Sequence, residues 1–391
     1  MKQKFTLGVE EEFQIIDPYT RNLKCRIAQL MDASTPLDGV ELHPELHQSV
    51  VEVNTPVCQD IEEVRTAVTN NRIEAARIAH RVGLRLGAAS THPFARWQDQ
   101  VISNKERYAK LVDDLQDIAR ANLIYGMHVH VGIEDKDEAI AIFNSARYFL
   151  PHLLALSTSS PFFDGRKTGL KSARSNIFQR LPRTGIPGRF NSYHEFEAFV
   201  ATLVSTGSID DGARIWWDLR PHSRFSTLEF RICDLPTRVD DVIAITALVQ
   251  SLVAKLSWLH RNNQSWQNHR FELIRENKWR AARYGCSGPL IDFGKRCEIP
   301  FPDIVGEMIG LVSDIADDLG CTKELEHLHT IVAEGTSADR QLRVFEESGG
   351  NLEAVVDFIL DETVLGLNLG SILKDEPVLY SSSPPHPAPA D

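Results

Sequence analysis

The segment Gly8–Phe13 reads Gly-Val-Glu-Glu-Glu-Phe and places carboxylates in a strand pattern with an apolar face. Side chains alternate along a β-strand, so Val9 and Phe13 share one face while Glu10 and Glu12 share the other. Two carboxylates side by side repel each other and are tolerated only where a cation or several hydrogen-bond donors hold them. The alternative is an exposed strand whose glutamates are solvated. Other segments of the sequence must show whether this strand belongs to a ligand site or to the exposed surface.

Three later segments show the same alternation of apolar residues with acid, histidine or arginine. They are residues 49–55 around Glu52, residues 127–133 around His128 and His130, and residues 226–233 around Glu229 and Arg231. Taken singly, each has an ordinary explanation: a surface glutamate, a hydrogen-bonded structural histidine beside a solvent-facing one, or an ion pair on an exposed edge. Taken together, their polar faces carry metal-ligand side chains in place of the Thr, Lys and Ser of a solvated face.

Glutamate oxygens with one histidine suit Mg²⁺ or Mn²⁺ better than zinc. Such ions bridge phosphate oxygens in enzyme sites, so a nucleotide is the expected ligand. The sequence has neither a G-x-x-x-x-G-K-[ST] nor a G-x-G-x-x-G motif. ATP would therefore bind through metal ions and arginines on a sheet.

Basic residues concentrate in and after residues 159–193 of this acidic chain. The guanidinium fork donates two parallel hydrogen bonds to phosphate or carboxylate, so the cluster predicts anionic ligands, although some members will be plain surface charges. The cluster comprises Arg166, Lys167, Lys171, Arg174, Arg180, Arg183, Arg214, Arg220 and Arg231.

The periodicity of apolar residues predicts an α+β fold. Strands are expected at 5–16, 49–55, 84–89, 127–133, 214–220 and 226–233, and helices at about 60–83, at about 103–120 and from Asp135 onward. Asp60 and Glu63 form a capping box that opens the first helix. Further helices are expected at 237–260, 264–283, 302–319, 322–333, 338–347 and 351–365.

These patterns predict a mainly antiparallel sheet from residues 1–235, covered by helices, many of them from the helical part 236–370. We expect one catalytic domain, residues 1–380, with Trp216 and Trp217 packed under its sheet. Residues 159–193 are rich in Ser, Gly, Pro and Arg and predict a long loop, a candidate lid. The Pro-rich tail, residues 381–391, is expected to be disordered.

Composition excludes several classes of function. The chain has 54 Asp and Glu against 42 Lys and Arg, a formal charge of −12 that repels nucleic-acid backbones. No stretch approaches 18 consecutive apolar residues, so a membrane span is not expected. The six cysteines are scattered without a C-x-x-C pair, so we expect free thiols and a cytoplasmic location.

Seven motifs occur in order between about residues 5 and 240: GVEEEF, HPEL…VEVNTP, GMHVHVG, SSPFFDGRKTGLKSARSNIF, LPRTGIP, IWWDLRPH and TLEFRICDLPT. Through them the chain resembles the YbdK-like carboxylate–amine ligases, also called type 2 glutamate–cysteine ligases. The resemblance implies a glutamine synthetase-like catalytic fold, in which an antiparallel sheet curves around Mg²⁺ and ATP.

The resemblance also implies roles for individual residues. Arg231 would contact phosphate, Arg174 would contact the carboxylate substrate or the transferred phosphate, and Arg220 would be a further ATP contact. His130 receives no role, and the strand pattern alone does not place Glu45. The implied metal ligands are Glu10, Glu12, Glu45, Glu52, His128 and Glu229.

By resemblance, the function is ATP-dependent amide formation of the glutamate–cysteine ligase type, an activity often weak in this group. Mg²⁺ would neutralise the β- and γ-phosphates while a carboxylate takes the γ-phosphoryl group, and an amine would then attack the acyl phosphate. Two other functions fit the residues: a metal-dependent hydrolase using His128 and His130, and a non-catalytic nucleotide- or amino-acid-binding homologue. Glutamate and cysteine are the expected substrates by resemblance alone, and a homodimer is a reasonable expectation.

Overall fold

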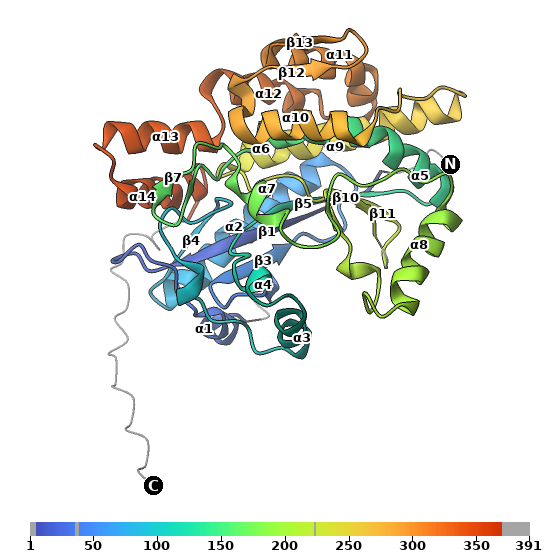
Figure 1. The fold of residues 1–391 in the computed structure, drawn as a ribbon. Coiled ribbons are helices and arrows are strands. Elements are labelled where there is room, and N and C mark those ends of the chain that lie inside the picture. The colour runs from blue at the N-terminus through green and yellow to red at the C-terminus, as the bar shows by residue number, and fades with distance from the viewer. Residues whose placement is uncertain (1–4, 36–38, 223, 370–391) are drawn as a thin grey trace, which may run out of the picture.

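The computed structural model describes residues 5–35, 39–222 and 224–369, and its centre is a seven-stranded sheet (Figure 1). Its strands follow the order β10 (Leu219–Pro221), β11 (Thr227–Phe230), β5 (Met127–Gly132), β1 (Leu7–Ile16), β3 (Val50–Asn54) and β2 (Leu42–Pro44), and β4 (Arg85–Gly87) also pairs with β1. Every pairing in this sheet is antiparallel, so the predicted α+β fold with a mainly antiparallel sheet is confirmed.

One face of the sheet is apolar because alternate side chains of its strands point to the same side. Val9, Val51 and Val129 are each at most 1% exposed. Three helices pack on this face or its edges: α2 (Ile61–Arg81), α5 (Lys136–Ala146) and α9 (Val239–Arg261). Full burial of a valine or leucine contributes about 1.5–3 kcal/mol, so this layer fixes which face of each strand turns inward.

The remaining helices lie on both sides of this core (Figure 1). Above the sheet, α6 (Leu150–Ser157), α11 (Phe301–Leu319) and α12 (Thr322–Glu334) contact α9, and α10 (Phe271–Tyr284) contacts α6. Below it lie α1 (Ile27–Ala33), α3 (Glu106–Leu115) and α4 (Asp117–Arg120). To one side, α13 (Ser337–Glu347) and α14 (Leu352–Thr363) pack together, and α14 contacts β4.

The strand-rich and helical parts of the chain share one core. A single cluster of buried apolar residues runs from Leu7 of β1 to Ile331 of α12. The helical character expected after residue 237 is confirmed, with a small hairpin of β12 (Leu290–Asp292) and β13 (Cys297–Ile299) in addition. The assignment of residues 1–380 to one domain stays a prediction.

The capping box at the start of α2 closes differently from the expectation. The Asp60 side chain accepts a hydrogen bond from the Glu63 N–H at 2.9 Å. The Glu63 carboxylate accepts from the N–H of Gln59 at 2.7 Å rather than from that of Asp60. Both contacts still satisfy donors at the helix start, and a cap of this kind contributes about 1 kcal/mol.

Residues 159–193 are not a loop throughout. Ser172 caps a short helix by accepting a hydrogen bond from the Ser175 N–H, which stabilises a turn that has no apolar period. Residues 193 onward form a helix that the sequence pattern left unassigned. The added elements are β6 (Phe162–Phe163), β7 (Arg166–Lys167), α7 (Ala173–Phe178), β8 (Thr184–Gly185) and α8 (Tyr193–Ser205). The strand expected at 214–220 is divided into β9 (Trp216–Trp217), which pairs with β8, and β10.

Two predicted helices have other boundaries. The helix expected at 103–120 breaks at Gln116, whose φ of 49° is left-handed, into α3 and α4. The helix expected at 264–283 begins only at Phe271, after an irregular stretch. No Gly or Pro marks either boundary, so local signals could not place them. The predicted disordered tail, 381–391, lies outside the described residues.

Two helical stretches are long and apolar enough to cross a membrane by length and composition. They are Lys136–Ser157 and Val239–Arg261, and 89% and 83% of their apolar windows are buried inside the protein. The second contacts β5 and the helices α2, α5, α11 and α12, as a core helix does.

A buried ion pair between Glu11 and Arg72 lies on the apolar side of the sheet. Arg72 Nη2 is 2.6 Å from Glu11 Oε1, and the two side chains are 1% and 3% exposed. Arg72 also donates to the backbone oxygens of Pro236, Thr237 and Thr363. It therefore joins β1 to the segment before α9 and to the end of α14. The partner of Glu11 lies 61 residues away, and no local pattern predicts it.

We expect Arg72→Met to lower the free energy of unfolding by about 3–5 kcal/mol, because it leaves the Glu11 carboxylate buried without a partner. Urea denaturation measures this loss. Arg77→Met on the same helix is the control: it removes only a partly exposed pair with Glu74 and should cost less than about 1 kcal/mol. Equal losses in the two variants would contradict the prediction.

Candidate active site

Strand register brings the polar residues of neighbouring strands together on the face opposite the apolar layer. β1 lies between β3 and β5, so its acidic positions have partners on both sides. The directly opposed pairs are Glu10 with His128, Glu10 with Asn54, Glu12 with Glu52, His130 with Glu229 and Arg220 with Glu229. The convergence that the sequence pattern requires is therefore present.

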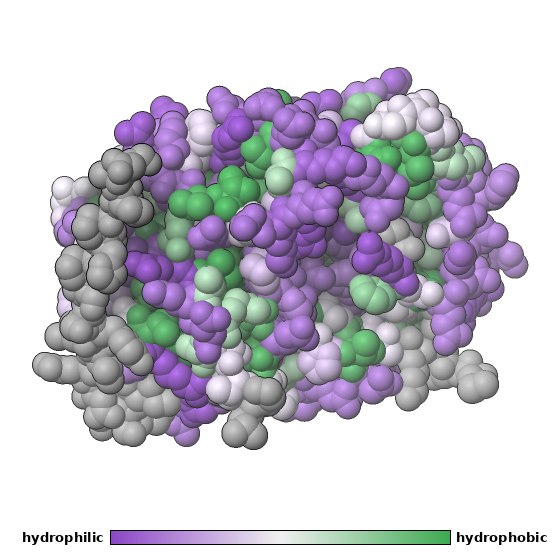
Figure 2. All heavy atoms as spheres, turned by 90° about the horizontal axis from the view of Figure 1, so that it is seen from below, coloured by the Kyte–Doolittle hydropathy of each residue, from purple (hydrophilic) through white to green (hydrophobic). Residues whose placement is uncertain are grey.

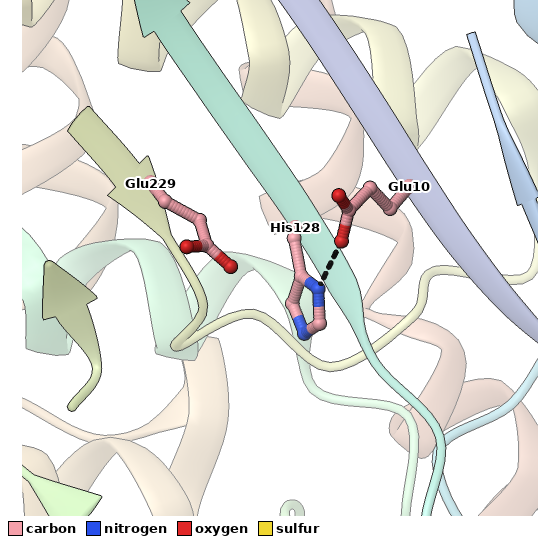
Figure 3. Close-up of side chains that lie close together, drawn as sticks. All are labelled: Glu10, His128 and Glu229. Carbon is pink, nitrogen blue, oxygen red and sulfur yellow. Dashed lines mark hydrogen bonds and ion pairs between the residues drawn. The ribbon is translucent and has the colours of Figure 1, made fainter. Parts of the chain in front are cut away.

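Glu10, His128 and Glu229 form the one group among the described residues whose ligand atoms could share a metal ion, all within 4.8 Å of one another. The His128 ring lies between the two carboxylates, and its Nδ1 is 2.7 Å from Glu10 Oε2 (Figure 3). Burial and then Arg231 lower the pKa of His128 to about 4, so the imidazole is neutral near pH 7. Two carboxylates and a neutral imidazole are donors that Mg²⁺ and Mn²⁺ accept.

Glu12, Glu45 and Glu52 line the same cavity and repel one another. Burial and then Glu45 raise the pKa of Glu12 to about 7. Burial and then Glu10 raise the pKa of Glu52 well above its usual range, and burial also raises the pKa of Glu45. Gly126 supplies Glu12 with an N–H donor at 2.6 Å. Carboxylates in this arrangement ionise fully only beside a cation, so the donor set fits divalent ions.

Glu229 is held by two arginines. Arg220 Nε and Arg231 Nη1 both donate to its carboxylate. Burial acts to raise the pKa of Glu229, but Arg231 and Arg220 lower it well below the usual range. Arg220 also donates to the backbone oxygens of Ala213 and Ile215, at 3.0 and 2.9 Å. These bonds favour a role for Arg220 in positioning Glu229, and its role as an ATP contact stays a prediction.

The Arg174 guanidinium packs directly against Gly126. A Cβ on Gly126 would lie 2.4 Å from Arg174 Nη2. Nη1 and Nη2 of Arg174 donate to the backbone oxygens of Ile232 and Arg231, at 3.3 and 3.1 Å. Because Gly126 also donates its N–H to Glu12, this one glycine sets the spacing between Glu12 and Arg174.

Asp234 anchors the chain that leads into Arg174. Its buried carboxylate accepts from the hydroxyl groups of Ser160 and Ser172, at 2.7 and 2.8 Å, and from the Ser159 N–H at 3.0 Å. The Ser160 hydroxyl oxygen in turn accepts from the Arg174 N–H at 3.1 Å. These hydrogen bonds therefore fix the start of α7, which carries Arg174.

The lid role expected for residues 159–193 stays a prediction. Only Arg174, Phe178 and Leu181 of this segment line the cavity. The parts bonded to Asp234 are buried, whereas residues 164–167 are exposed or partly exposed. Any closing movement would therefore have to come from the exposed parts.

The glutamates of the site, His128 and the three arginines Arg174, Arg220 and Arg231 line one cavity of about 740 Å³, a volume typical of ligand sites. Figure 2 shows the molecule from below, the side on which α3 lies in Figure 1, and hydrophilic residues predominate there. Glu45, which the strand pattern could not place, follows β2 and reaches the cavity. The sequence-predicted residues that line it are Glu10, Glu12, Glu45, Glu52, His128, Arg174, Arg220, Glu229 and Arg231.

Other members of the basic cluster are not part of this site. Lys167 pairs with Glu346 and Lys171 pairs with Asp339, both away from the cavity. Arg214 does line it. Four of the nine clustered basic residues, Arg174, Arg214, Arg220 and Arg231, therefore reach the cavity.

Several cavity residues were missed by the sequence analysis. Arg107, Tyr108 and Lys110 come from α3, where a cluster of basic and aromatic residues on an ordinary-looking helix was the only signal. Trp216 was expected under the sheet but lines the cavity, because successive side chains of β9 point to opposite sides. Trp217 is the one that packs inside, stacked on Phe199.

His222 also lines the cavity, although the sequence analysis gave it no role. Its ring lies edge-on to that of His130, with the ring centroids 5.5 Å apart. His130 Nε2 is 3.1 Å from Glu10 Oε1, so both histidines of β5 bond to the same carboxylate.

Comparison with known proteins gives consistent matches. The model of glutamate-cysteine ligase family 2 matches residues 6–357. A Sorangium cellulosum protein named "Putative glutamate–cysteine ligase 2" is 52% identical over 369 residues, which cover 93% of this chain and 97% of that protein. A Herpetosiphon aurantiacus protein of the same name is 50% identical over 365 residues, covering 93% and 94%.

Among solved structures, the chain is similar to the glutamate–cysteine ligase of Francisella tularensis in complex with AMP. The TM-score is 0.67 at 13% identity, and the match covers 96% of this chain and 92% of that one. At this identity the likeness concerns the fold alone, and it confirms the expected glutamine synthetase-like fold class.

The raised pKa of Glu12 predicts that its contribution to stability falls as pH rises in the absence of divalent ions. A carboxyl group whose pKa is raised by folding favours the folded state below its unfolded pKa, 4.5, and loses that contribution as pH rises through its folded pKa, about 7. In EDTA, we expect the wild type to lose about 1–3 kcal/mol more than Glu12→Gln across this range, measured by urea denaturation.

Saturating Mg²⁺ should remove the difference, because the ion binds the ionised carboxylate. Identical pH profiles of wild type and Glu12→Gln in EDTA would show that Glu12 is not held in a repulsive setting.

Proposed function

The chain belongs to glutamate-cysteine ligase family 2, and we propose that it is an ATP-dependent carboxylate–amine ligase of the glutamate–cysteine ligase type. The family resemblance carried by the seven ordered motifs is confirmed. One observation carries the proposal: in a single cavity, the group Glu10, His128 and Glu229 lies beside the guanidinium groups of Arg174 and Arg231.

The acidic residues would hold Mg²⁺ or Mn²⁺. When bound, such an ion neutralises the β- and γ-phosphates of ATP and so allows an anionic carboxylate to approach. The mutual repulsion of Glu12, Glu45 and Glu52 supports this, since only a cation would keep them all ionised. One ion would be held by Glu10, His128 and Glu229, and further ions by Glu12, Glu45 and Glu52.

Arg231 and Arg174 would stabilise the transferred phosphoryl group or the substrate carboxylate. Arg231 commits Nη1 to Glu229, while its Nη2 has no hydrogen-bond partner among the described residues and can donate to a ligand. Guanidinium donors suit the negative charge that spreads over phosphoryl oxygens. Removing one donor of this kind costs about 10²–10³ in rate.

The reaction needs no reactant besides ATP, the acid and the amine. A carboxylate oxygen of the acid substrate attacks the γ-phosphorus, and the bond to ADP breaks. The amine nitrogen then attacks the acyl carbon, phosphate leaves, and the nitrogen loses a proton. The cavity walls would limit the access of water, which otherwise hydrolyses the acyl phosphate.

The relatives' shared name supports glutamate as the acid and cysteine as the amine. We place the enzyme in the cytoplasm, since all six cysteines are free thiols and a reducing compartment keeps them so. A homodimer is part of the proposal on general grounds, because cyclic dimers are the commonest oligomers.

Two other functions use the same residues. In a metal-dependent hydrolase, His128 and His130 would serve a water-activating ion, and turnover would need no nucleotide. In a non-catalytic homologue, ATP or an amino acid would bind without turnover. The family match favours the ligase over both.

We expect release of ADP to require glutamate, cysteine and Mg²⁺ together, measured by a coupled ADP assay. The double variant Glu10→Gln with Glu12→Gln should lower this rate at least about 10²-fold, because it removes ligand charge from both acidic groups. Glu62→Gln, an exposed position on α2, is the matched control and should keep the wild-type rate.

Hydrolysis of a substrate in the absence of any nucleotide would identify a hydrolase. If a screen of acid and amine pairs gives no ADP release while ATP still binds, the binding homologue is correct.

We expect Gly126→Ala to lower turnover about 10–10²-fold while the protein still folds, because the new Cβ displaces only the end of the Arg174 side chain. Gly8→Ala on β1 is the matched control, since its nearest neighbour would be His130 Cβ at an ordinary 3.6 Å. In an Arg174→Ala background, Gly126→Ala should have little further effect. If the losses of turnover in the two single variants add up in the double variant, Gly126 acts independently of Arg174.

A further inference from the structure

A second cavity, of about 460 Å³, lies among the C-terminal helices and the β12–β13 hairpin. In Figure 1 these elements lie above the sheet, whereas α3, which lines the candidate active site, lies below it. The two cavities share no lining residue. Its volume is in the usual range for small-molecule sites.

One side of this cavity is aromatic. Tyr148 and Phe149 precede α6, and their ring centroids lie 5.7 and 5.0 Å from that of Trp266. His269 lies 5.3 Å from Tyr148. Trp266 and His269 belong to the stretch before α10 that the sequence predicts as helix, but the stretch is irregular and both residues line the cavity.

An aliphatic part of the lining comes from the hairpin and α11. A cavity with aromatic and aliphatic walls accepts a planar apolar ring, which gains stacking as well as burial. The aliphatic residues are Ile291, Ile299, Ile304, Met308 and Leu311.

His152 of α6 supplies a polar point inside the cavity. It is 3% exposed, and its Nδ1 is shielded from solvent beside the backbone of Tyr148 and Phe149. Its Nε2 forms no hydrogen bond with the described residues and is the nitrogen left for a ligand. Burial lowers the pKa of His152 to about 4, although hydrogen bonding to that backbone acts to raise it, so the imidazole is neutral near pH 7. An unpartnered buried nitrogen is costly, and a ligand hydroxyl or N–H would satisfy it.

The mouth of the cavity carries charges of both signs. Lys295 Nζ lies 2.5 Å from Glu307 and 3.5 Å from Asp292, and the side chains of Lys295 and Glu307 are 50% and 53% exposed. Two carboxylates against one ammonium leave a negative charge unmatched. A ligand ammonium would complete the balance, and a ligand carboxylate could pair with the accessible lysine.

We propose that this cavity binds an aromatic amino acid whose ring carries a hydroxyl or an N–H, that is, tyrosine or tryptophan. The ring lies between the aromatic and aliphatic walls, and its polar atom bonds to His152. The α-ammonium lies at Asp292 and Glu307, and the α-carboxylate pairs with Lys295.

The site also has a direct route to Arg174, so we infer that its occupancy changes ligase kinetics, an inference that rests on the proposed function. α6 runs from His152 to Ser157, whose hydroxyl oxygen accepts from the Asp234 N–H at 3.2 Å. Asp234 anchors the chain that leads into Arg174. A small shift of α6 would therefore move the support of Arg174.

Calorimetric titration of the full chain with L-tyrosine, L-tryptophan, L-phenylalanine and tyramine tests the binding. We expect L-tyrosine to bind about tenfold tighter than L-phenylalanine, the value of one hydrogen bond to a buried group. Tyramine, which lacks the carboxylate, should also bind more weakly than L-tyrosine. The absence of heat with all four compounds would overturn the proposal, and equal affinity for L-tyrosine and tyramine would overturn the role of Lys295.

Variants locate the site. Met308→Trp should abolish binding by filling the cavity, whereas the same change at the exposed Met31 of α1 should leave it intact. His152→Phe should bind L-tyrosine and L-phenylalanine equally, and it tests the site even if Met308→Trp does not fold. Unchanged selectivity in His152→Phe would overturn the assignment of the ring's polar atom.

The kinetic effect is measured separately. L-tyrosine should change kcat or KM for ADP release in the wild type but not in Met308→Trp. Binding without any kinetic change would overturn the proposed coupling to the active site, while the proposed binding site would stand. If no acid and amine pair releases ADP, the ligase proposal fails, while calorimetry still decides whether the cavity binds.

Discussion

The position of β1 between β3 and β5 is the constraint on which the rest of the structure depends. Both pairings are antiparallel, so Glu10 lies opposite His128 on one side and Asn54 on the other. A slip of one residue would send the glutamates of β1 into the apolar layer and its valine and phenylalanine into the cavity. The helices packed on the apolar face make such a slip costly, so hydrophobic packing on one face holds the charged arrangement on the other.

Buried charge is balanced on the apolar face of the sheet and unbalanced on the cavity face. On the apolar face, Glu11 is matched by Arg72, whose remaining donors are filled by backbone oxygens. On the cavity face, burial and neighbouring carboxylates raise the pKa values of Glu12 and Glu52, which have few donors. The first arrangement serves stability, while the second lowers it, and a bound cation would relieve the repulsion. An unsatisfied cluster of this kind is expected where binding, rather than folding, has shaped the residues.

Much of the site could be predicted because the alternation of strand side chains is local. The strand pattern identified Glu10, Glu12, Glu52, His128 and Glu229, and all of them line the cavity. The family resemblance added Glu45. Cavity residues on helices and irregular segments were not predicted, because residues such as Arg107 and Tyr108 on α3 show no such alternation. The same limit explains the segment before and within α7, which was expected as a loop but is tied to Asp234 through side-chain bonds.

The sequence by itself determined which side of each strand is apolar and which carries ligand-type groups, because that depends only on neighbouring residues and a period of two. It also determined the family, through ordered motifs. Only the tertiary structure decided which strands are neighbours, how Arg220 is engaged, and that Gly126 brings Arg174 close to Glu12. These contacts join residues far apart in the chain, and their geometry follows from strand register and packing, which no local pattern encodes.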